Sequence, residues 1–152
     1  MSKSVVVALL IMALLIGWYA FTTPPQQRDI LHALRTADTI TVSEYLRGPL
    51  EGGYEGPLTQ KTLSEEERKE LQKAFTLHGL ADKPTCDFDP HHKIECHMPD
   101  SSVIVINLCF LCNQYALANG KSTGMGPWNT SLRETLRKLG IPIRPEMYAK
   151  KS

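Results

Sequence analysis

The sequence predicts a small α+β domain preceded by one N-terminal transmembrane helix. Three observations lead to this prediction: an uncharged apolar run near the N-terminus, two segments with helix-capping signals, and several short segments of alternating polarity between them. Hydrophobic residues make up 42% of the 152 residues and charged residues 22%, as expected for one folded domain. We therefore expect a mostly antiparallel sheet with two main helices.

The first element is the uncharged run at residues 5–21. As a helix it would be about 25 Å long, close to the roughly 30 Å of a hydrocarbon core. Lys3 precedes the run, and Trp18 and Tyr19 lie near its end, where interfacial aromatic residues are common. We expect residues 1–21 to form a signal anchor in the inner (cytoplasmic) membrane of a bacterium, with the C-terminal domain in the periplasm or outside the cell. A cleaved signal peptide is the alternative, although Trp18 stands where a small residue is expected.

Residues 22–37 are predicted to form a tether and a short helix. Two prolines and two glutamines favour an extended start to this segment, and residues 28–35 place their apolar side chains on one side of a helix. The domain is expected to cover residues 38–148. It begins with a strand at residues 38–46, where polar and apolar residues alternate, and a loop rich in glycine and proline follows at residues 48–57.

The two main helices are marked by their ends. Ser64 and Glu67 have capping-box spacing, which predicts a helix from this point to about His78. Ser131 begins a similar pattern, and Gly140 ends it. Between these helices, strands are predicted at residues 85–88, 92–98, 103–109 and 113–118.

The net charge argues against nucleic acid as a partner. The chain has 17 Lys and Arg residues against 16 Asp and Glu residues, so the basic excess typical of nucleic-acid binding is missing. The short signatures of common catalytic sites are also missing from the sequence. Asp87, Asp89 and His91 favour a local turn over an acid/base group.

The four cysteines carry the main functional question. Outside the cytosol, Cys86, Cys96, Cys109 and Cys112 would oxidise, and an even number is consistent with two disulfides in one of three pairings. If Cys109 and Cys112 lay in one strand they would face opposite sides, and each would bond to Cys86 or Cys96. If the chain turns after Cys109, these two cysteines could instead bond to each other.

A metal site is one alternative interpretation. Zinc would take Cys109 and Cys112 with one or two further ligands from the set Cys86, Cys96, His91 and His92. A second closely spaced pair of ligands is lacking, and adjacent histidines in an extended segment point to opposite sides. We therefore expect no cofactor, with zinc as the alternative.

Thiol–disulfide exchange at Cys109 and Cys112 is the other alternative. A strand followed by Cys-x-x-Cys is typical of thioredoxin-like proteins, where a helix N-terminus lowers the thiol pKa. Only about two turns of chain, residues 113–119, separate this motif from Gly120, so the supporting helix would be too short.

The cysteine segments also resemble a family. Residues 86–92 (CDFDPHH) and 109–113 (CFLCN) are similar to a pattern, C-x-F-x-P-x-H followed by C-F-x-C, in uncharacterised bacterial extracytoplasmic proteins. The resemblance covers about thirty residues and implies a membrane-anchored or secreted bacterial protein, with His92 at the position of the family histidine. It implies no activity.

Partner contacts are expected in two loops. The loop at residues 48–57 contains Tyr54, and the loop at residues 120–128 contains Met125 and Trp128, which could anchor a protein partner at the same membrane. The function that we expect is that of a non-catalytic binding or assembly module: an accessory subunit of an envelope complex, or an inhibitor or immunity-type protein.

Overall fold

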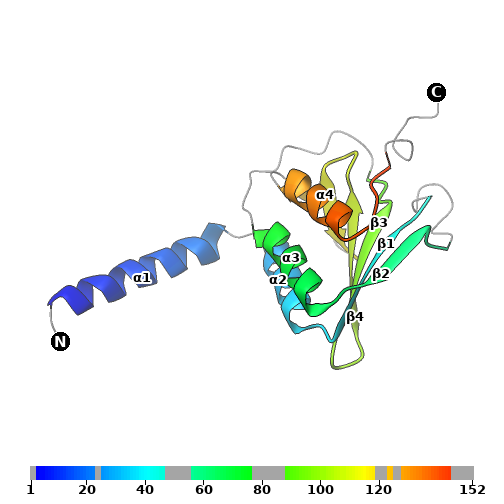
Figure 1. The fold of residues 1–152 in the computed structure, drawn as a ribbon. Helices are drawn as coiled ribbons and strands as arrows, with labels where there is room; N and C mark the ends of the chain where they lie inside the picture. Colours follow the sequence, from blue (N-terminus) through cyan, green and yellow to red (C-terminus); the bar gives the residue numbers. More distant parts are fainter. Residues whose placement is uncertain are drawn as a thin grey trace.

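The structure is a computed structural model of the whole chain. It describes residues 3–22, 25–46, 56–76, 88–118, 123–124 and 128–144. Within this part of the chain, one long helix stands apart from a domain in which three helices cover a sheet (Figure 1). The fold is therefore α+β, as predicted.

The N-terminal helix α1 (Lys3–Thr22) is 20 residues long and projects away from the domain (Figure 1). The side chains of its residues 5–14 are exposed. Among the described residues, no helix meets the joint requirement of length and apolar character for crossing a membrane. The transmembrane helix predicted at residues 5–21 therefore remains a prediction.

The sheet has six antiparallel strands in the order β2-β1-β3-β4-β5-β6. Its strands are β1 (Thr39–Glu44), β2 (Thr59–Thr62), β3 (His92–His97), β4 (Val103–Cys109), β5 (Gln114–Leu117) and β6 (Thr123–Gly124). The prediction of an antiparallel sheet is confirmed, and β1, β3, β4 and β5 lie where alternation of polarity predicts them. The short strand β2 was not predicted, because all four of its residues are polar.

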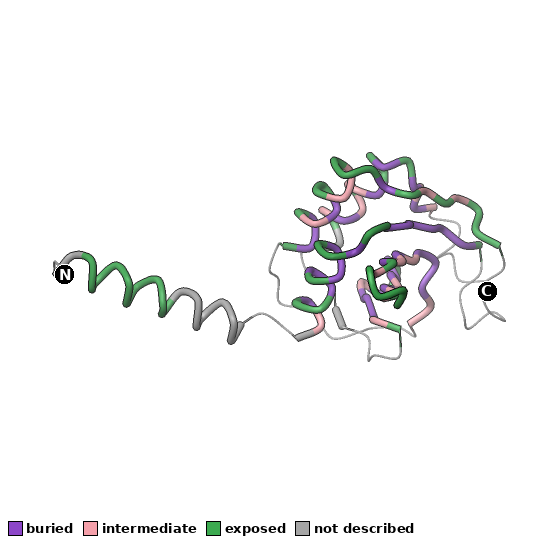
Figure 2. Tube along the Cα trace, turned by 90° about the horizontal axis from the view of Figure 1, so that it is seen from below, coloured by how far each residue is buried: buried purple, intermediate pink, exposed green. Residues whose placement is uncertain are grey.

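Three helices pack on one face of the sheet: α2 (Pro25–Thr36), α3 (Glu65–Thr76) and α4 (Trp128–Lys138) (Figure 1). Alternate residues of the central strands point toward these helices. The fully buried Val42, Ile94 and Ile106 form one row across β1, β3 and β4. Figure 2 shows the buried stripes of the helices turned toward the sheet, so a single core holds both layers together.

The prediction of an extended tether at residues 22–27 is wrong for its second half, because residues 25–27 belong to helix α2. The helix begins at Pro25, because proline suits the first turn of a helix. Gln27, expected in the tether, is 2% exposed, and its Nε2 donates a hydrogen bond to the Phe75 carbonyl at 3.2 Å. Ile30 and Leu34 of this helix are fully buried, so α2 is a third helix of the core.

The helix ends agree only partly with the predictions. The Ser64 backbone N–H donates to Glu67 Oε2 at 3.0 Å, and the Glu67 backbone N–H donates to Ser64 Oγ at 3.3 Å, so the capping box is confirmed. Helix α4 begins at Trp128, three residues before the predicted cap at Ser131. Its end is confirmed: Gly140 has a φ of 80°, a left-handed conformation that favours glycine.

Candidate functional site: the cysteine and histidine cluster

The cysteines and histidines singled out from the sequence lie along β3, β4 and the turn after β4. Leu108 pairs with His92 across these strands, and Cys109 pairs with Gln114 at the start of β5. The chain therefore turns at residues 110–113, which separates Cys109 from Cys112. Residues 77–87 lie outside the described residues, so the predicted strand at 85–88 and the place of Cys86 cannot be set against the structure.

Cys96 is a core residue of the sheet. Its side chain is fully buried on the helix-covered face of β3, in the same row as Ile40 of β1. Burial raises the pKa of the Cys96 thiol to about 12, because a thiolate would lose its hydration there. At neutral pH this side chain is a protonated packing group, unsuited to metal binding or nucleophilic attack.

Cys109 is also buried, with 1% of its surface exposed. The backbone N–H of Cys112 donates to its sulfur at 3.4 Å, and the backbone N–H groups of Asp89 and Leu111 also hydrogen-bond to it. These bonds favour the thiolate, but desolvation outweighs them and raises the pKa of Cys109. The thiol is therefore protonated at neutral pH and closed to large disulfide substrates.

The expectation of two disulfides is not met. Cys96 and Cys109 are free thiols, whereas Cys112 is disulfide-bonded. Cys96 pairs with Ile104, five residues before Cys109 on β4, so the two thiols are about 16 Å apart along the strands. A disulfide requires Cα atoms within about 7 Å of each other, so Cys96 and Cys109 cannot bond to each other.

The two adjacent histidines point to opposite faces of the sheet. His92 is fully buried on the helix-covered face, where its Nε2 donates to the Pro142 carbonyl at 2.8 Å and its ring meets Phe110 edge-on at 5.2 Å. Burial lowers the pKa of His92 to about 4; the Pro142 hydrogen bond opposes this shift, and the charges of His91 and Arg133 add to it. His92 is therefore neutral at pH 7 and ties residues 141–144 to the sheet.

His91 lies between two oxygen atoms on the other side of the strand. Its Nδ1 is 3.3 Å from the Tyr45 carbonyl, and its Nε2 is 3.6 Å from Asp89 Oδ2. Nδ1 donates a hydrogen bond to the Tyr45 carbonyl, and the Asp89 carboxylate lies at ion-pair distance from Nε2. This contact agrees with the local turn predicted at residues 87–91 rather than with an accessible acid/base group.

The described candidates for the alternative zinc site do not lie together, and Cys86 lies outside the described residues. A cysteine binds zinc as a thiolate, and the sulfur of Cys112 is committed to a disulfide. Cys96 is distant from Cys109, and His91 and His92 diverge. Across the part of the chain that the structure describes, no three His, Cys, Asp or Glu side chains are grouped so that they could hold a metal ion.

A buried carboxylate at the same end of the sheet was not predicted. Glu44 is fully buried, accepts a hydrogen bond from Thr59 Oγ1 at 3.0 Å, and pairs with the Arg144 guanidinium at 3.3 Å. On the neighbouring strand β3, His92 is the residue paired with Glu44. The alternation of β1 contains the missing signal: Glu44 has the same parity as Ile40 and Val42, which places it on the buried face.

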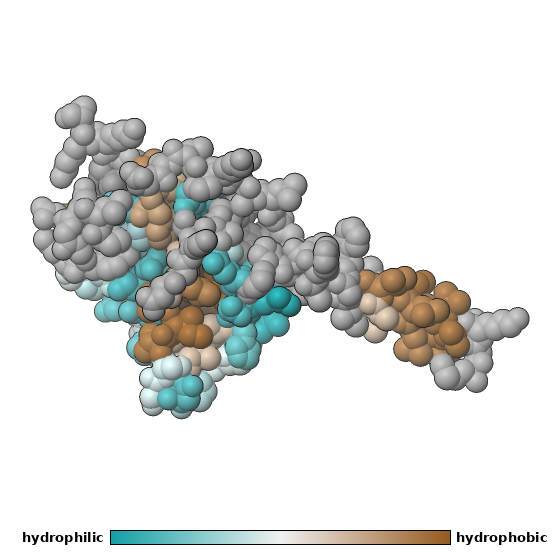
Figure 3. Space-filling model, turned by 180° about the vertical axis from the view of Figure 1, so that it is seen from behind, coloured by the Kyte–Doolittle hydropathy of each residue, from teal (hydrophilic) through white to brown (hydrophobic). Residues whose placement is uncertain are grey.

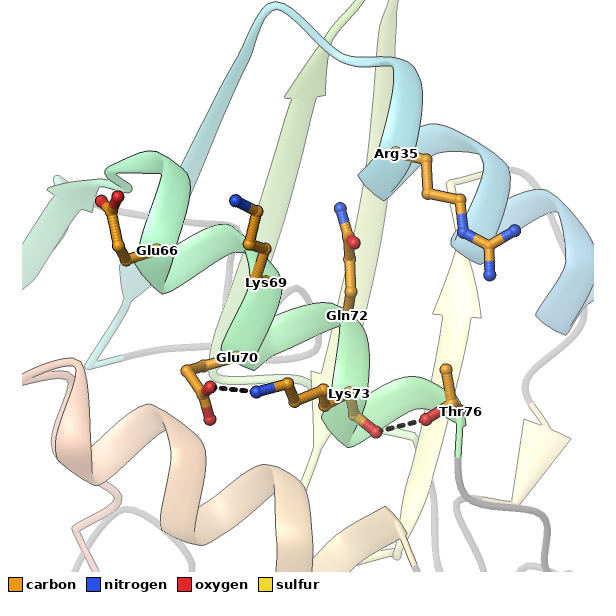
Figure 4. A pocket seen from close by; sticks show the side chains of 7 residues that line it. All are labelled: Arg35, Glu66, Lys69, Glu70, Gln72, Lys73 and Thr76. Carbon is orange, nitrogen blue, oxygen red and sulfur yellow. Dashed lines mark hydrogen bonds and ion pairs between the residues drawn. The ribbon is translucent and has the colours of Figure 1, made fainter.

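A groove of about 390 Å³ lies on the outer surface of α3 and reaches the end of α2 (Figure 4). It is lined by Arg35, Glu66, Lys69, Glu70, Gln72, Lys73 and Thr76. Charges of both signs alternate along it, and Lys73 is paired with Glu70 at 2.6 Å. The groove is therefore an exposed helix surface whose positive and negative side chains offset one another. Its side chains do not point toward a common centre as they would in a binding site (Figure 4).

The structure does not describe the side chains of the three predicted partner-binding residues. Tyr54 and Met125 lie outside the described residues, and Trp128 is described only as the first residue of α4. No protein-family model matches the chain, and searches of curated proteins and of solved structures found no significant match.

Proposed function

We propose that the protein is a membrane-anchored binding or assembly module whose domain lies outside the cytosol. It would act as an accessory subunit of an envelope complex or as an inhibitor of immunity type. The observation that carries the proposal is the exposed apolar surface of α1. Lipid is the environment that suits such a surface best.

The described side chains of α1 are apolar and open to solvent. Val7, Leu10 and Leu14 are 54%, 59% and 72% exposed. Figure 3 shows this part of α1 as a hydrophobic surface that stands clear of the domain. Soluble proteins rarely leave a continuous apolar surface of this kind in water. The 20 residues of α1 amount to about 30 Å of helix, similar to the thickness of a hydrocarbon core.

The sulfur chemistry supports a location outside the cytosol. A disulfide at Cys112 is compatible with an oxidising compartment and unusual in a reducing one. The two remaining described cysteines are buried thiols with raised pKa values, so they contribute to packing rather than to catalysis. A stable domain held at a membrane gains effective concentration toward partners at that membrane, which suits an assembly role.

Charge in the middle of α1 tests the anchor. We expect Leu9→Arg with Leu10→Arg to move the protein from the membrane pellet to the soluble fraction after carbonate extraction. Each arginine in the middle of a span costs about 2.5–3.5 kcal/mol. The matched control is Leu46→Arg, which places the same charge at a 51% exposed leucine of the domain and should leave the protein in the pellet. Equal distribution of the wild type and the double variant would refute the anchor.

A further inference from the structure

We propose that residues 141–144, which we call the strap, are released from the sheet in acid. When His92 gains a proton, its charge competes with Arg144 for the Glu44 carboxylate, and the strap detaches while the rest of the domain stays folded. This inference rests on contacts within the domain and does not depend on the membrane anchor.

The strap is fastened to the sheet by side chains rather than by backbone pairing. Ile141 and Ile143 are buried, with 0% and 7% of their surface exposed. The Ile141 backbone N–H donates to the Leu136 carbonyl of α4 at 2.9 Å. Among the described residues, no backbone hydrogen bond joins residues 142–144 to the sheet. The strap can therefore detach without breaking the ladder of hydrogen bonds between the strands.

Two polar contacts fasten the strap. His92 Nε2 donates to the Pro142 carbonyl at 2.8 Å, and Glu44 pairs with the Arg144 guanidinium at 3.3 Å. His92 and Glu44 are paired on β3 and β1, and both are fully buried. The Cβ atoms of directly paired residues lie about 5 Å apart. One buried carboxylate therefore lies next to two basic side chains, of which only Arg144 is charged at neutral pH.

The charged groups around His92 come from several elements. Glu44 faces it from β1, Arg133 from α4 and Arg144 from the strap, while His91 is its neighbour on β3. Protonation of His92 adds a cation to a site that already holds two arginines and one carboxylate. Departure of Arg144 with the strap relieves the repulsion between the cations and leaves the Glu44 carboxylate to the protonated histidine.

Protons therefore favour the open strap. Burial lowers the pKa of His92 to about 4 in the closed state; the Pro142 hydrogen bond opposes this shift, and the charges of His91 and Arg133 add to it. A hydrated histidine titrates near 6.5, so the open state binds the proton more tightly and opening becomes easier as the pH falls. Between pH 7 and pH 4.5 the ratio of open to closed strap should rise by at most about fiftyfold.

Hydrogen exchange at the Ile141 amide tests the strap. The full-length protein in detergent micelles would be measured by NMR at pH 7 and pH 4.5, and each rate divided by the intrinsic rate at that pH gives an opening constant. We expect this constant to rise between about tenfold and about fiftyfold on acidification. It should not change in about 1 M urea, because a local opening exposes little surface. The Ile94 and Ile106 amides, on β3 and β4, should open less often and respond to urea.

Three variants separate the groups involved. His92→Gln keeps a donor for the Pro142 carbonyl but cannot gain a charge, so the opening constant of Ile141 should lose its pH dependence. His97→Gln is the matched control, because it makes the same substitution at an exposed histidine of the same strand, and the rise should persist. Glu44→Gln removes the carboxylate that holds the strap and should raise the opening constant at pH 7 about tenfold.

The wild-type measurement decides even if a variant folds poorly. The inference is wrong if the Ile141 opening constant rises less than about tenfold between pH 7 and pH 4.5. It is also wrong if Ile141 has the same opening constant and the same urea dependence as Ile106, because the strap would then open only when the domain unfolds. Among the variants, a full rise in His92→Gln or unchanged opening in Glu44→Gln would equally contradict it.

Discussion

Replacing Arg144 with methionine is expected to lower the free energy of unfolding by about 3 kcal/mol. The substitution leaves the Glu44 carboxylate, which is fully buried, without the guanidinium now 3.3 Å away. Removing one partner of a buried ion pair typically costs 3–5 kcal/mol, because the remaining charge stays desolvated. We expect the lower end of this range, since the Arg144 side chain is 39% exposed. Urea denaturation followed by circular dichroism measures the change.

Two further variants separate charge burial from general damage. Lys73→Met breaks a surface pair with Glu70 by the same chemical change, and we expect little measurable effect, because water solvates both side chains. Glu44→Leu combined with Arg144→Met removes both charges and should recover much of the lost stability. If Arg144→Met were as harmless as Lys73→Met, residues 141–144 would not be held by this pair.

Acidification from pH 6.5 to pH 4 is expected to destabilise the fold by about 3 kcal/mol through His92 alone. Burial lowers the pKa of His92 to about 4, whereas an unfolded histidine titrates near 6.5. In this window the unfolded chain binds more protons than the native one, so stability falls as the pH falls. The stability that neutral His92 contributes is kept above about pH 6.5 and is lost in full below about pH 4.

The effect of His92 protonation is measured by the slope of the unfolding free energy against pH, because a substitution can also change that free energy by the same amount at every pH. His92→Gln should flatten the slope between pH 6.5 and 4.5, whatever its effect on the absolute free energy. His97→Gln is the matched control, because it makes the same substitution at an exposed histidine at the end of the same strand. The carboxylates with lowered pKa values, Glu67, Glu70 and Asp100, titrate below this window. A slope unaltered in His92→Gln would show that folding does not lower the pKa of His92, which would contradict the account.

The regular part of the fold could be predicted from local signals. Strand β4 follows its apolar run, the Ser64 capping box starts α3, and Gly140 ends α4, because each feature is set by neighbours in the sequence. Strand β2 has no apolar alternation in its sequence. Its four polar residues form a strand by pairing with β1 at the edge of the sheet. Helix α2 extends back to Pro25, and Gln27 in its first turn is buried against α3, a contact that local sequence does not indicate.

The candidate site was less predictable, because it depends on partners that are distant in the sequence. The alternation of His91 and His92 correctly places them on opposite faces. The separation of Cys96 from Cys109, however, follows from strand register, which puts them about 16 Å apart, and the turn after β4 places Cys109 against the backbone of Cys112. The contact between Glu44 and Arg144 joins residues one hundred positions apart, and a single sequence contains no sign of it.

The central claim is that α1 holds the domain at a membrane, beyond the cytosol. The most direct test is a pair of C-terminal fusions in a bacterial host, one to alkaline phosphatase, which is active only outside the cytosol, and one to a fluorescent protein that matures only inside. The account predicts an active phosphatase and a dark fluorescent fusion. An inactive phosphatase with a bright fluorescent fusion would contradict it.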